Sequence, residues 1–221
     1  MSNITTKNTT LLKLNLSDSA NVQEAFDITR SSSCVQMTAW QTVTGSISES
    51  YQNVLEDARL DLIPNHREWN EEEIKMEFVS LVMRAAKINE PQKIKVFYER
   101  PLKRVINGYD ISVQCDCSVA TPTVGGRPAQ PYFFFKEFKR TKGDSLDPEA
   151  QMLAAMVAAQ DINADDKPIY GAYQQGIFWT FCILTHKLYC TGKTFNATET
   201  SDLHQIVYML QHLKTMILER I

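Results

Sequence analysis

Glu137 and Lys139 are the residues whose types and spacing most directly suggest chemistry in this chain. They lie near the end of the run YFFFKEFKR, residues 132–140, whose four aromatic residues predict a strand that starts in a hydrophobic core. Side chains two residues apart in a strand point to the same face. A carboxylate and an ammonium group held there can bind a divalent cation and stabilise developing negative charge, as metal-assisted phosphodiester hydrolysis requires. The alternative is an ordinary surface ion pair, worth less than about 1 kcal/mol.

Asp116 is a second acidic residue that a strand is expected to present. Residues 109–119 alternate between apolar side chains at odd positions and polar side chains at even positions. This period of two predicts a strand whose back is buried and whose polar face carries Asp116. Asn107-Gly108 is a strong signal for a two-residue hairpin turn, so residues 93–106 are expected to form the partner strand.

An acidic helix is expected before this hairpin. Asn70 has the residue type of an N-cap, and Glu73 three residues later completes a capping box. Glu71 and Glu72 occupy the first turn, where the helix dipole favours anions. Glu73 and Glu77 lie one turn apart on the flank of the helix. They are candidates for an active-site acid, and the alternative is a solvent-exposed acidic face.

A second helix and further strands are expected after the aromatic strand. Asp147-Pro148-Glu149 combines an N-cap, a proline at the first helical position and an acid in the first turn, and Gln151 follows one turn in. Short apolar runs then predict strands over residues 169–173, 177–184 and 188–191, and a final helix over residues 200–221. Within the aromatic strand, Phe133 and Phe135 share the parity of Glu137, whereas the opposite parity belongs to Tyr132, Phe134, Lys136 and Phe138. Helices are therefore expected on both faces of the sheet.

The first third of the chain predicts mainly helices. Apolar residues recur at helical spacing over residues 21–30, 34–43 and 46–60. The leucines of residues 11–16 nearly alternate, which suits a short edge strand or a loosely docked arm. Residues 1–65 are therefore expected to form an N-terminal helical extension, whose role the sequence does not disclose.

Composition narrows the class of protein. The 221 residues are 43% hydrophobic, and no apolar run reaches the roughly 18 residues of a transmembrane helix. The N-terminus lacks the layout of a secretory signal, and the odd number of cysteines suits reduced core thiols, so we expect a cytoplasmic protein without a membrane partner. A net charge of -3 argues against a uniformly basic surface that coats nucleic acid. Either a local basic cleft or a solvated strand edge would explain Lys136, Lys139, Arg140 and Lys142.

The order of these elements resembles the PD-(D/E)XK nuclease superfamily. An acidic helix comes first, and it is followed by the strand with Asp116, the strand with Glu137 and Lys139, and the helix with Gln151. The core of this superfamily is an αβββαβ unit with an Asp on the second strand, Glu-x-Lys on the third and an acid on the first helix. The runs DPEAQMLAAMVAAQ and PIYGAYQQGIFWTF look like those of bacterial proteins akin to the N-terminal nuclease domain of type I restriction motor subunits. The resemblance covers about residues 60–221. It departs at Cys115, where the family motif has a proline.

The resemblance implies an α/β fold with a restriction-endonuclease-like αβββαβ core, in which helices flank a mixed central sheet. Residues 66–221 would form this nuclease-like domain, behind the N-terminal helical extension of residues 1–65. The implied function is a Mg2+-dependent nuclease that hydrolyses DNA in a defence or repair setting, with Mn2+ able to replace Mg2+. The alternative is a catalytically inactive nuclease-like fold that serves as a DNA-binding or protein-interaction module. A homodimer or the partner subunits of a larger assembly would suit either function.

The resemblance also implies roles for single residues. Asp116 and Glu137 would be metal ligands, with the backbone carbonyl of Phe138 as a third. Lys139 would orient or activate the attacking water, and Gln151 would position the lysine or the water. The acid of the first helix would be Glu73 or Glu77, between which the sequence does not choose.

Overall fold

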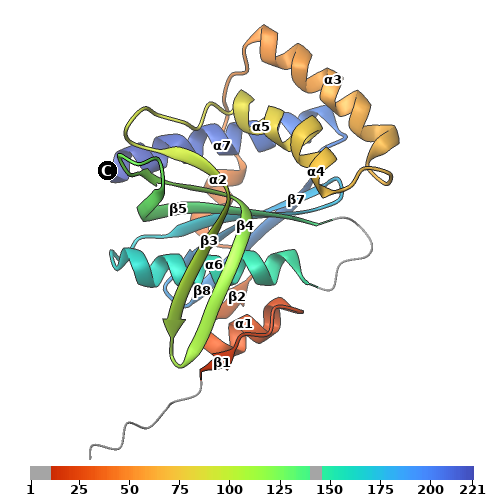
Figure 1. Ribbon diagram of the computed structural model, residues 1–221. Coiled ribbons are helices and arrows are strands. Elements are labelled where there is room, and N and C mark those ends of the chain that lie inside the picture. Colours follow the sequence, from red (N-terminus) through yellow and green to blue (C-terminus); the bar gives the residue numbers. More distant parts are fainter. Residues whose placement is uncertain (1–10, 140–145) are drawn as a thin grey trace, which may run out of the picture.

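The computed structural model of the protein describes residues 11–139 and 146–221. Its described strands form one eight-stranded mixed sheet with helices on both faces, an α/β fold (Figure 1). The strands are β1 (Leu12–Lys13), β2 (Thr29–Ser31), β3 (Lys95–Ile106), β4 (Tyr109–Pro122), β5 (Pro128–Lys139), β6 (Ile169–Gln175), β7 (Phe178–Thr185) and β8 (Leu188–Asn196). The helices are α1 (Ser19–Phe26), α2 (Val35–Gln41), α3 (Glu49–Asn65), α4 (Glu71–Ile74), the π-helical turn η1 (Lys75–Val79), α5 (Ser80–Ala85), α6 (Pro148–Asn163) and α7 (Thr200–Arg220).

The sheet order is β1-β4-β5-β6-β7-β8-β2. The strand β3 lies outside this order and pairs with β4. The strands β3, β4 and β5 are antiparallel neighbours, as the Asn107-Gly108 turn predicts. The next pair, β5 and β6, is parallel, which requires a crossover connection, and α6 supplies it. From the acidic helix onward the elements therefore follow the predicted order of helix, three strands, helix and strand.

Two hydrophobic clusters cover the two faces of the sheet. On one face, α1 and α6 pack against β4 through a cluster that includes Val22, Ile111 and Leu153. The other face is covered by α2, α3, α5 and α7, as Figure 1 shows. The helix α6 lies close to β6, because a Cβ on Gly171 would come within 2.7 Å of the Met152 sulfur. This close contact fixes the height of α6, and hence of Gln151, above the sheet.

The N-terminal segment is helical where predicted but adds strands to the sheet. The strand β1 pairs in parallel with β4, consistent with the edge strand expected from the leucines of residues 11–16. The helix predicted over residues 21–30 is wrong at its end, because Asp27 adopts a left-handed φ of 55° that stops α1. Residues Thr29–Ser31 then pair in parallel with β8 as β2. None of the described helices has the length and apolar content needed to cross a membrane.

The aromatic strand is buried on both faces, as expected, but Phe133 and Tyr132 lie on the faces opposite to those predicted, and Tyr132 stacks on Phe135. Phe133, Phe134 and Phe135 are all buried. The predicted parity is wrong for Phe133, which joins the cluster of Phe134 rather than that of Phe135. The reason is a bulge, since Val119 pairs with Phe134 and Ala120 pairs with Tyr132, which leaves Phe133 as an extra residue.

Candidate active site

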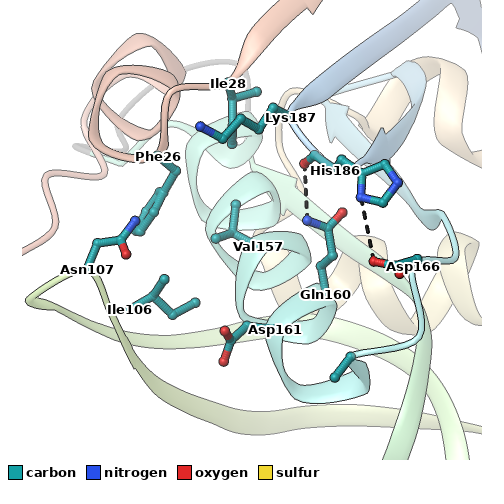
Figure 2. A pocket seen from close by; sticks show the side chains of 11 residues that line it. Phe26, Ile28, Ile106, Asn107, Val157, Gln160, Asp161, Asp166, His186 and Lys187 are labelled. Carbon is teal, nitrogen blue, oxygen red and sulfur yellow. Dashed lines mark hydrogen bonds and ion pairs between the residues drawn. The ribbon is translucent and has the colours of Figure 1, made fainter.

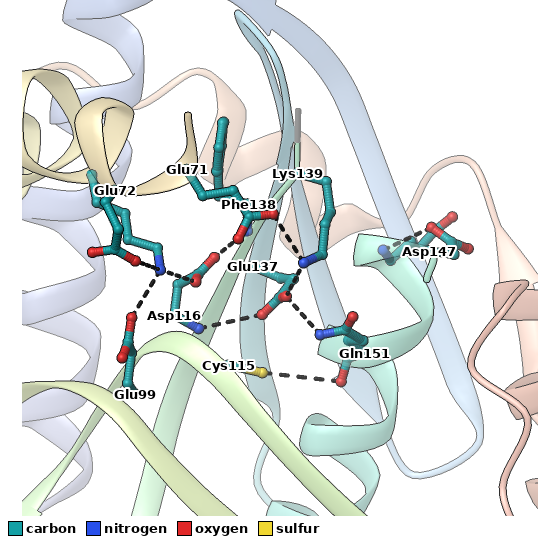
Figure 3. Close-up of polar contacts among 12 residues, drawn as sticks. Glu71, Glu72, Glu99, Cys115, Asp116, Glu137, Phe138, Lys139, Asp147 and Gln151 are labelled. Atoms are coloured by element: carbon teal, nitrogen blue, oxygen red, sulfur yellow. Dashed lines mark hydrogen bonds and ion pairs between the residues drawn. The ribbon is translucent and has the colours of Figure 1, made fainter. Parts of the chain in front are cut away.

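Asp116 and Glu137 meet where β4 and β5 stop pairing. The last backbone pair on this side is Cys117 with Lys136. Beyond it, the Asp116 N–H donates to Glu137 Oε2 at 3.3 Å, and the Phe138 N–H donates to Asp116 Oδ2 at 2.6 Å (Figure 3). The two carboxylates thus accept backbone donors that the sheet no longer satisfies. This exchange holds both acids at the same end of the two strands.

Lys139 and Gln151 complete a group of four predicted residues that lie together. The Lys139 Nζ lies 3.8 Å from Glu137 Oε1, and Gln151 Nε2 donates to the same oxygen at 2.6 Å. Lys139 reaches this point because it shares the face of Glu137 on β5. Gln151 reaches it from the first turns of α6, whose N-cap Asp147 accepts a hydrogen bond from the Glu149 N–H. A carboxylate, an ammonium group and an amide thus converge beside Asp116.

Burial is the main influence on the charge of Glu137. Its side chain is 2% exposed, and desolvation together with the nearby Asp116 raises its pKa to about 8. Lys139 and the Asp116 N–H oppose this rise but do not cancel it. Glu137 is therefore only partly ionised at neutral pH, and an added cation would favour its ionised form.

The acid that the first helix brings to this group is Glu71. Its Oε1 lies 3.1 Å from the Lys139 Nζ. The structure brings neither Glu73 nor Glu77 there. Glu73 is exposed, and its carboxylate accepts the Asn70 N–H at 2.7 Å in the predicted capping box, while Glu77 is exposed on η1. The capping box is a pattern of the sequence. It engages the Glu73 carboxylate with the Asn70 N–H, so the sequence alone already indicated a partner for this side chain.

Three further residues surround Asp116, although no local sequence pattern indicates them: Lys75, Glu72 and Glu99. The Lys75 Nζ lies 2.9 Å from an oxygen of Asp116, of Glu72 and of Glu99. Burial alone would lower the pKa of Lys75, but its hydrogen bonds to these three carboxylates raise it. The position of Glu99 could have been found from the hairpin, because a two-residue turn at Asn107-Gly108 fixes a register that places Glu99 opposite Asp116.

Lys136 belongs neither to a basic cleft nor to a solvated strand edge, the two alternatives that the sequence left open, but it lies on the predicted face of its strand. This side chain is buried, and its Nζ lies 4.5 Å from the ring centroid of Trp179, on the opposite face of β5 from Glu137. Within the described part of the chain its Nζ has no hydrogen-bond partner, and burial lowers its pKa. Arg140 and Lys142 lie outside the described residues. Of the two basic residues of this run that the structure describes, Lys139 lies at the site and Lys136 does not.

The donor set fits a hydrated Mg2+ ion better than a softer metal. Among residues 11–139 and 146–221 no three His, Cys, Asp or Glu side chains are arranged to hold a metal ion. The carboxylates of Asp116 and Glu137, together with the backbone carbonyl of Phe138 that the sequence resemblance adds, are the candidate ligands. Such oxygen ligands, supplemented by water, suit Mg2+. Two features fit a bound cation: the pKa of the buried Glu137 is raised to about 8 despite its ion pair with Lys139, and the buried Gln151 Oε1 has no hydrogen-bond partner in the described structure. Cys115 fits poorly as a ligand, because burial raises the pKa of its thiol well above its usual value.

A separate hollow of about 250 Å³ lies at the other end of α6 (Figure 2). The second half of α6, the β3–β4 turn and the turn at His186 line it. Gln160 Nε2 donates to the His186 carbonyl at 3.1 Å, and the His186 ring lies 3.8 Å from Asp166. None of the residues that line this hollow belongs to the group around Asp116 and Glu137.

Comparison with known proteins leaves the function to be inferred from this geometry. No protein-family model matches the chain, and no curated protein matches it significantly.

Proposed function

We propose that this protein is a metal-dependent nuclease of the PD-(D/E)XK type and that its substrate is DNA. The observation that carries the proposal is the convergence of Asp116, Glu137, Lys139 and Gln151, which come from three different elements, at one end of β4 and β5. The order of α4–α5, β3, β4, β5, α6 and β6 supports a restriction-endonuclease-like core. DNA as the substrate follows from the sequence resemblance.

The proposed metal site consists of Asp116, Glu137 and the backbone carbonyl of Phe138. These oxygens would hold Mg2+, with Mn2+ as a substitute. A bound ion would supply a Lewis acid for the phosphate and lower the pKa of a water molecule. Glu137 would enter this site in its ionised form, since a cation offsets the burial that now raises its pKa.

Lys139 and Gln151 have different tasks in the proposed reaction. The ammonium group of Lys139 lies between Glu71 and Glu137, close enough to both to be held in one orientation. It would stabilise the negative charge that develops on the phosphate oxygens and orient the attacking water. Gln151 donates to Glu137 and so fixes the direction of that carboxylate. Its Oε1, which has no hydrogen-bond partner among the described residues, would accept a hydrogen bond from a water molecule in the site.

A calorimetric titration of the full-length protein with Mn2+, followed by incubation with single- and double-stranded DNA, tests the proposal. We expect saturable Mn2+ binding and cleavage of at least one DNA form with Mn2+ or Mg2+, and no cleavage with a chelator. Absence of binding at millimolar Mn2+ together with intact DNA in every reaction would contradict it.

One observation favours the alternative of a catalytically inactive nuclease-like fold that binds DNA or a protein. Both carboxylate oxygens of Asp116 already have protein partners, Oδ1 at Lys75 and Oδ2 at the Phe138 N–H. An inactive module would keep these contacts permanently. It would bind DNA or its protein partner with the same affinity in the presence of Mn2+ and of a chelator.

A further inference from the structure

Lys75 occupies a position that the proposed catalytic roles do not use. Its Nζ lies 2.9 Å from one carboxylate oxygen on each of three elements: Glu72 on α4, Glu99 on β3 and Asp116 on β4. The side chain is only 17% exposed. A lysine that served solubility would leave its ammonium group in water, whereas this one is the common centre of three carboxylates.

The two oxygens of Asp116 face different partners. Oδ1 contacts the Lys75 ammonium, and Oδ2 accepts the Phe138 N–H on the side of Glu137. Asp116 is thus shared between a cation that the chain itself supplies and the proposed metal site. Enzymes that cleave phosphodiesters with two ions share a carboxylate in the same way, between cations about 3.5–4 Å apart.

The acidic side chains around Lys75 and the backbone conformation of its neighbours suit a site that holds a cation. Among the described residues, the acidic side chains of Glu71, Glu72, Glu99, Asp116 and Glu137 lie around the ammonium groups of Lys75 and Lys139. Glu99 has a φ of 50°, a left-handed conformation that is uncommon for residues other than glycine. Lys75 begins the π-helical turn η1, and such turns are frequent at functional sites.

We propose that the Lys75 ammonium is a permanent second cation of the active site, in the place where two-metal enzymes carry a second divalent ion. This inference rests on the proposed function, because the first cation is the Mg2+ held by Asp116 and Glu137. Lys75 acts through Asp116: it holds Oδ1 and neutralises part of the acidic group, so a single divalent ion suffices. It is therefore a positioning residue, and the number of bound metal ions reports on its role.

The experiment is a calorimetric titration of the full-length protein and its variants with Mn2+. The wild-type protein should bind one ion. Lys75→Ala leaves three carboxylate oxygens that surrounded a common point, and a shift of less than about 1 Å would bring them to metal-ligand distance. This variant should bind two ions, and Mn2+ should raise its melting temperature by more than that of the wild type.

Three further variants serve as controls. Lys75→Arg keeps a cation and should bind one ion. Adding Glu99→Gln to Lys75→Ala removes a ligand of the second position only and should restore a stoichiometry of one. Lys187→Ala removes an exposed lysine that pairs with Asp27 and should leave the stoichiometry at one. Should Lys75→Ala fail to fold, Lys75→Gln offers a neutral donor for the same titration.

The results separate this inference from the proposed function. Two ions in the wild type, or one ion of unchanged affinity after Lys75 is neutralised, would overturn the role of Lys75 and leave the nuclease proposal standing. No ion in the wild type would overturn the proposed metal site instead. In that case a site that Lys75→Ala creates and Glu99→Gln removes would still support the ammonium as a stand-in for an ion, and no binding in any variant would overturn both.

Discussion

Glu137 is a carboxyl group that the fold buries with too little positive charge around it. Its pKa is raised from an ordinary value of 4.5 to about 8, first by burial and then by Asp116. In the unfolded chain the group ionises near its ordinary value. Between these two pH values the folded protein therefore binds more protons than the unfolded chain, and its stability falls as the pH rises.

The first prediction follows from this decrease in stability with rising pH. In the presence of a chelator, the free energy of unfolding of the wild type should decrease between pH 4.5 and about 8 relative to that of Glu137→Gln, which cannot ionise. The difference should grow by at most about 1.4 kcal/mol per pH unit. Urea denaturation of both proteins across this pH range measures it. Parallel stability profiles would show that Glu137 is not perturbed.

At this scale the sequence identified residues whose local pattern points to chemistry and missed those placed by long-range pairing. Glu137 and Lys139 share a strand face, and Asp116 lies on the polar side of an alternating strand. Lys136 looked like part of the same basic run, but strand parity turns it into the core beneath Trp179. Lys75 could not be selected, because its importance depends on carboxylates from β3 and β4 that lie far away in the chain.

The N-terminus of α6 connects the strands that carry the candidate site to the N-terminal segment. Glu149 is buried and accepts hydrogen bonds from Tyr189 at 2.9 Å, Ser19 at 3.2 Å and Arg30 at 3.0 Å. Asp147, the N-cap of α6, also accepts the Ser19 N–H at 2.9 Å. The helix that carries Gln151 is thus held by α1, β2 and β8 as well as by the sheet beneath it.

The second prediction concerns this connection. Glu149→Ala leaves Arg30 and the buried Tyr189 hydroxyl without their acceptor, and the free energy of unfolding should fall by about 3 kcal/mol. Glu24→Gln, which changes an exposed acid on α1, should alter it by less than about 0.5 kcal/mol. Chemical denaturation compares the two. An equal, small effect of both substitutions would mean that the hydrogen bonds to Glu149 contribute little.

The order of the main helices and strands was more predictable than the short strand β2 and the bulge in β5. Strong local signals, such as the capping box at Asn70 and the turn at Asn107-Gly108, fixed the helix and the hairpin that precede the site. The strand β2 is short and polar, and it forms only because β8 offers it a partner, so no local pattern indicates it. The bulge at Phe133 likewise depends on the register between β4 and β5 rather than on composition.

At the scale of the whole molecule, the N-terminal segment and the core share a sheet and a hydrophobic cluster. Trp40 is buried, packs edge-on against Phe181 at 5.1 Å and donates its Nε1–H to the Met209 carbonyl at 2.8 Å. Leu55 and Leu62 of α3 belong to the same cluster. The proposed division into residues 1–65 and 66–221 therefore separates parts that contribute to one core.

The third prediction is that residues 66–221 alone lose cooperative folding. Loss of Trp40 by itself should cost about 3–5 kcal/mol, a large part of the stability of a typical protein. Thermal unfolding followed by near-ultraviolet circular dichroism compares the truncated and the full chain. A cooperative transition of the truncated chain at the temperature of the full chain would show that residues 66–221 form an independent domain.

The most direct test of the nuclease proposal is to separate metal binding from cleavage. In the proposed mechanism Lys139 stabilises charge in the transition state rather than the ion, so Lys139→Ala should bind Mn2+ with nearly wild-type affinity while its rate of DNA cleavage falls by about 100-fold or more. Asp116→Asn should weaken both binding and cleavage. The measurement is the Mn2+-dependent cleavage rate of the three proteins on the DNA form that the wild type cleaves, beside their Mn2+ affinities. Cleavage by Lys139→Ala at the wild-type rate, or the same cleavage by all three proteins, would contradict the assignment of this site.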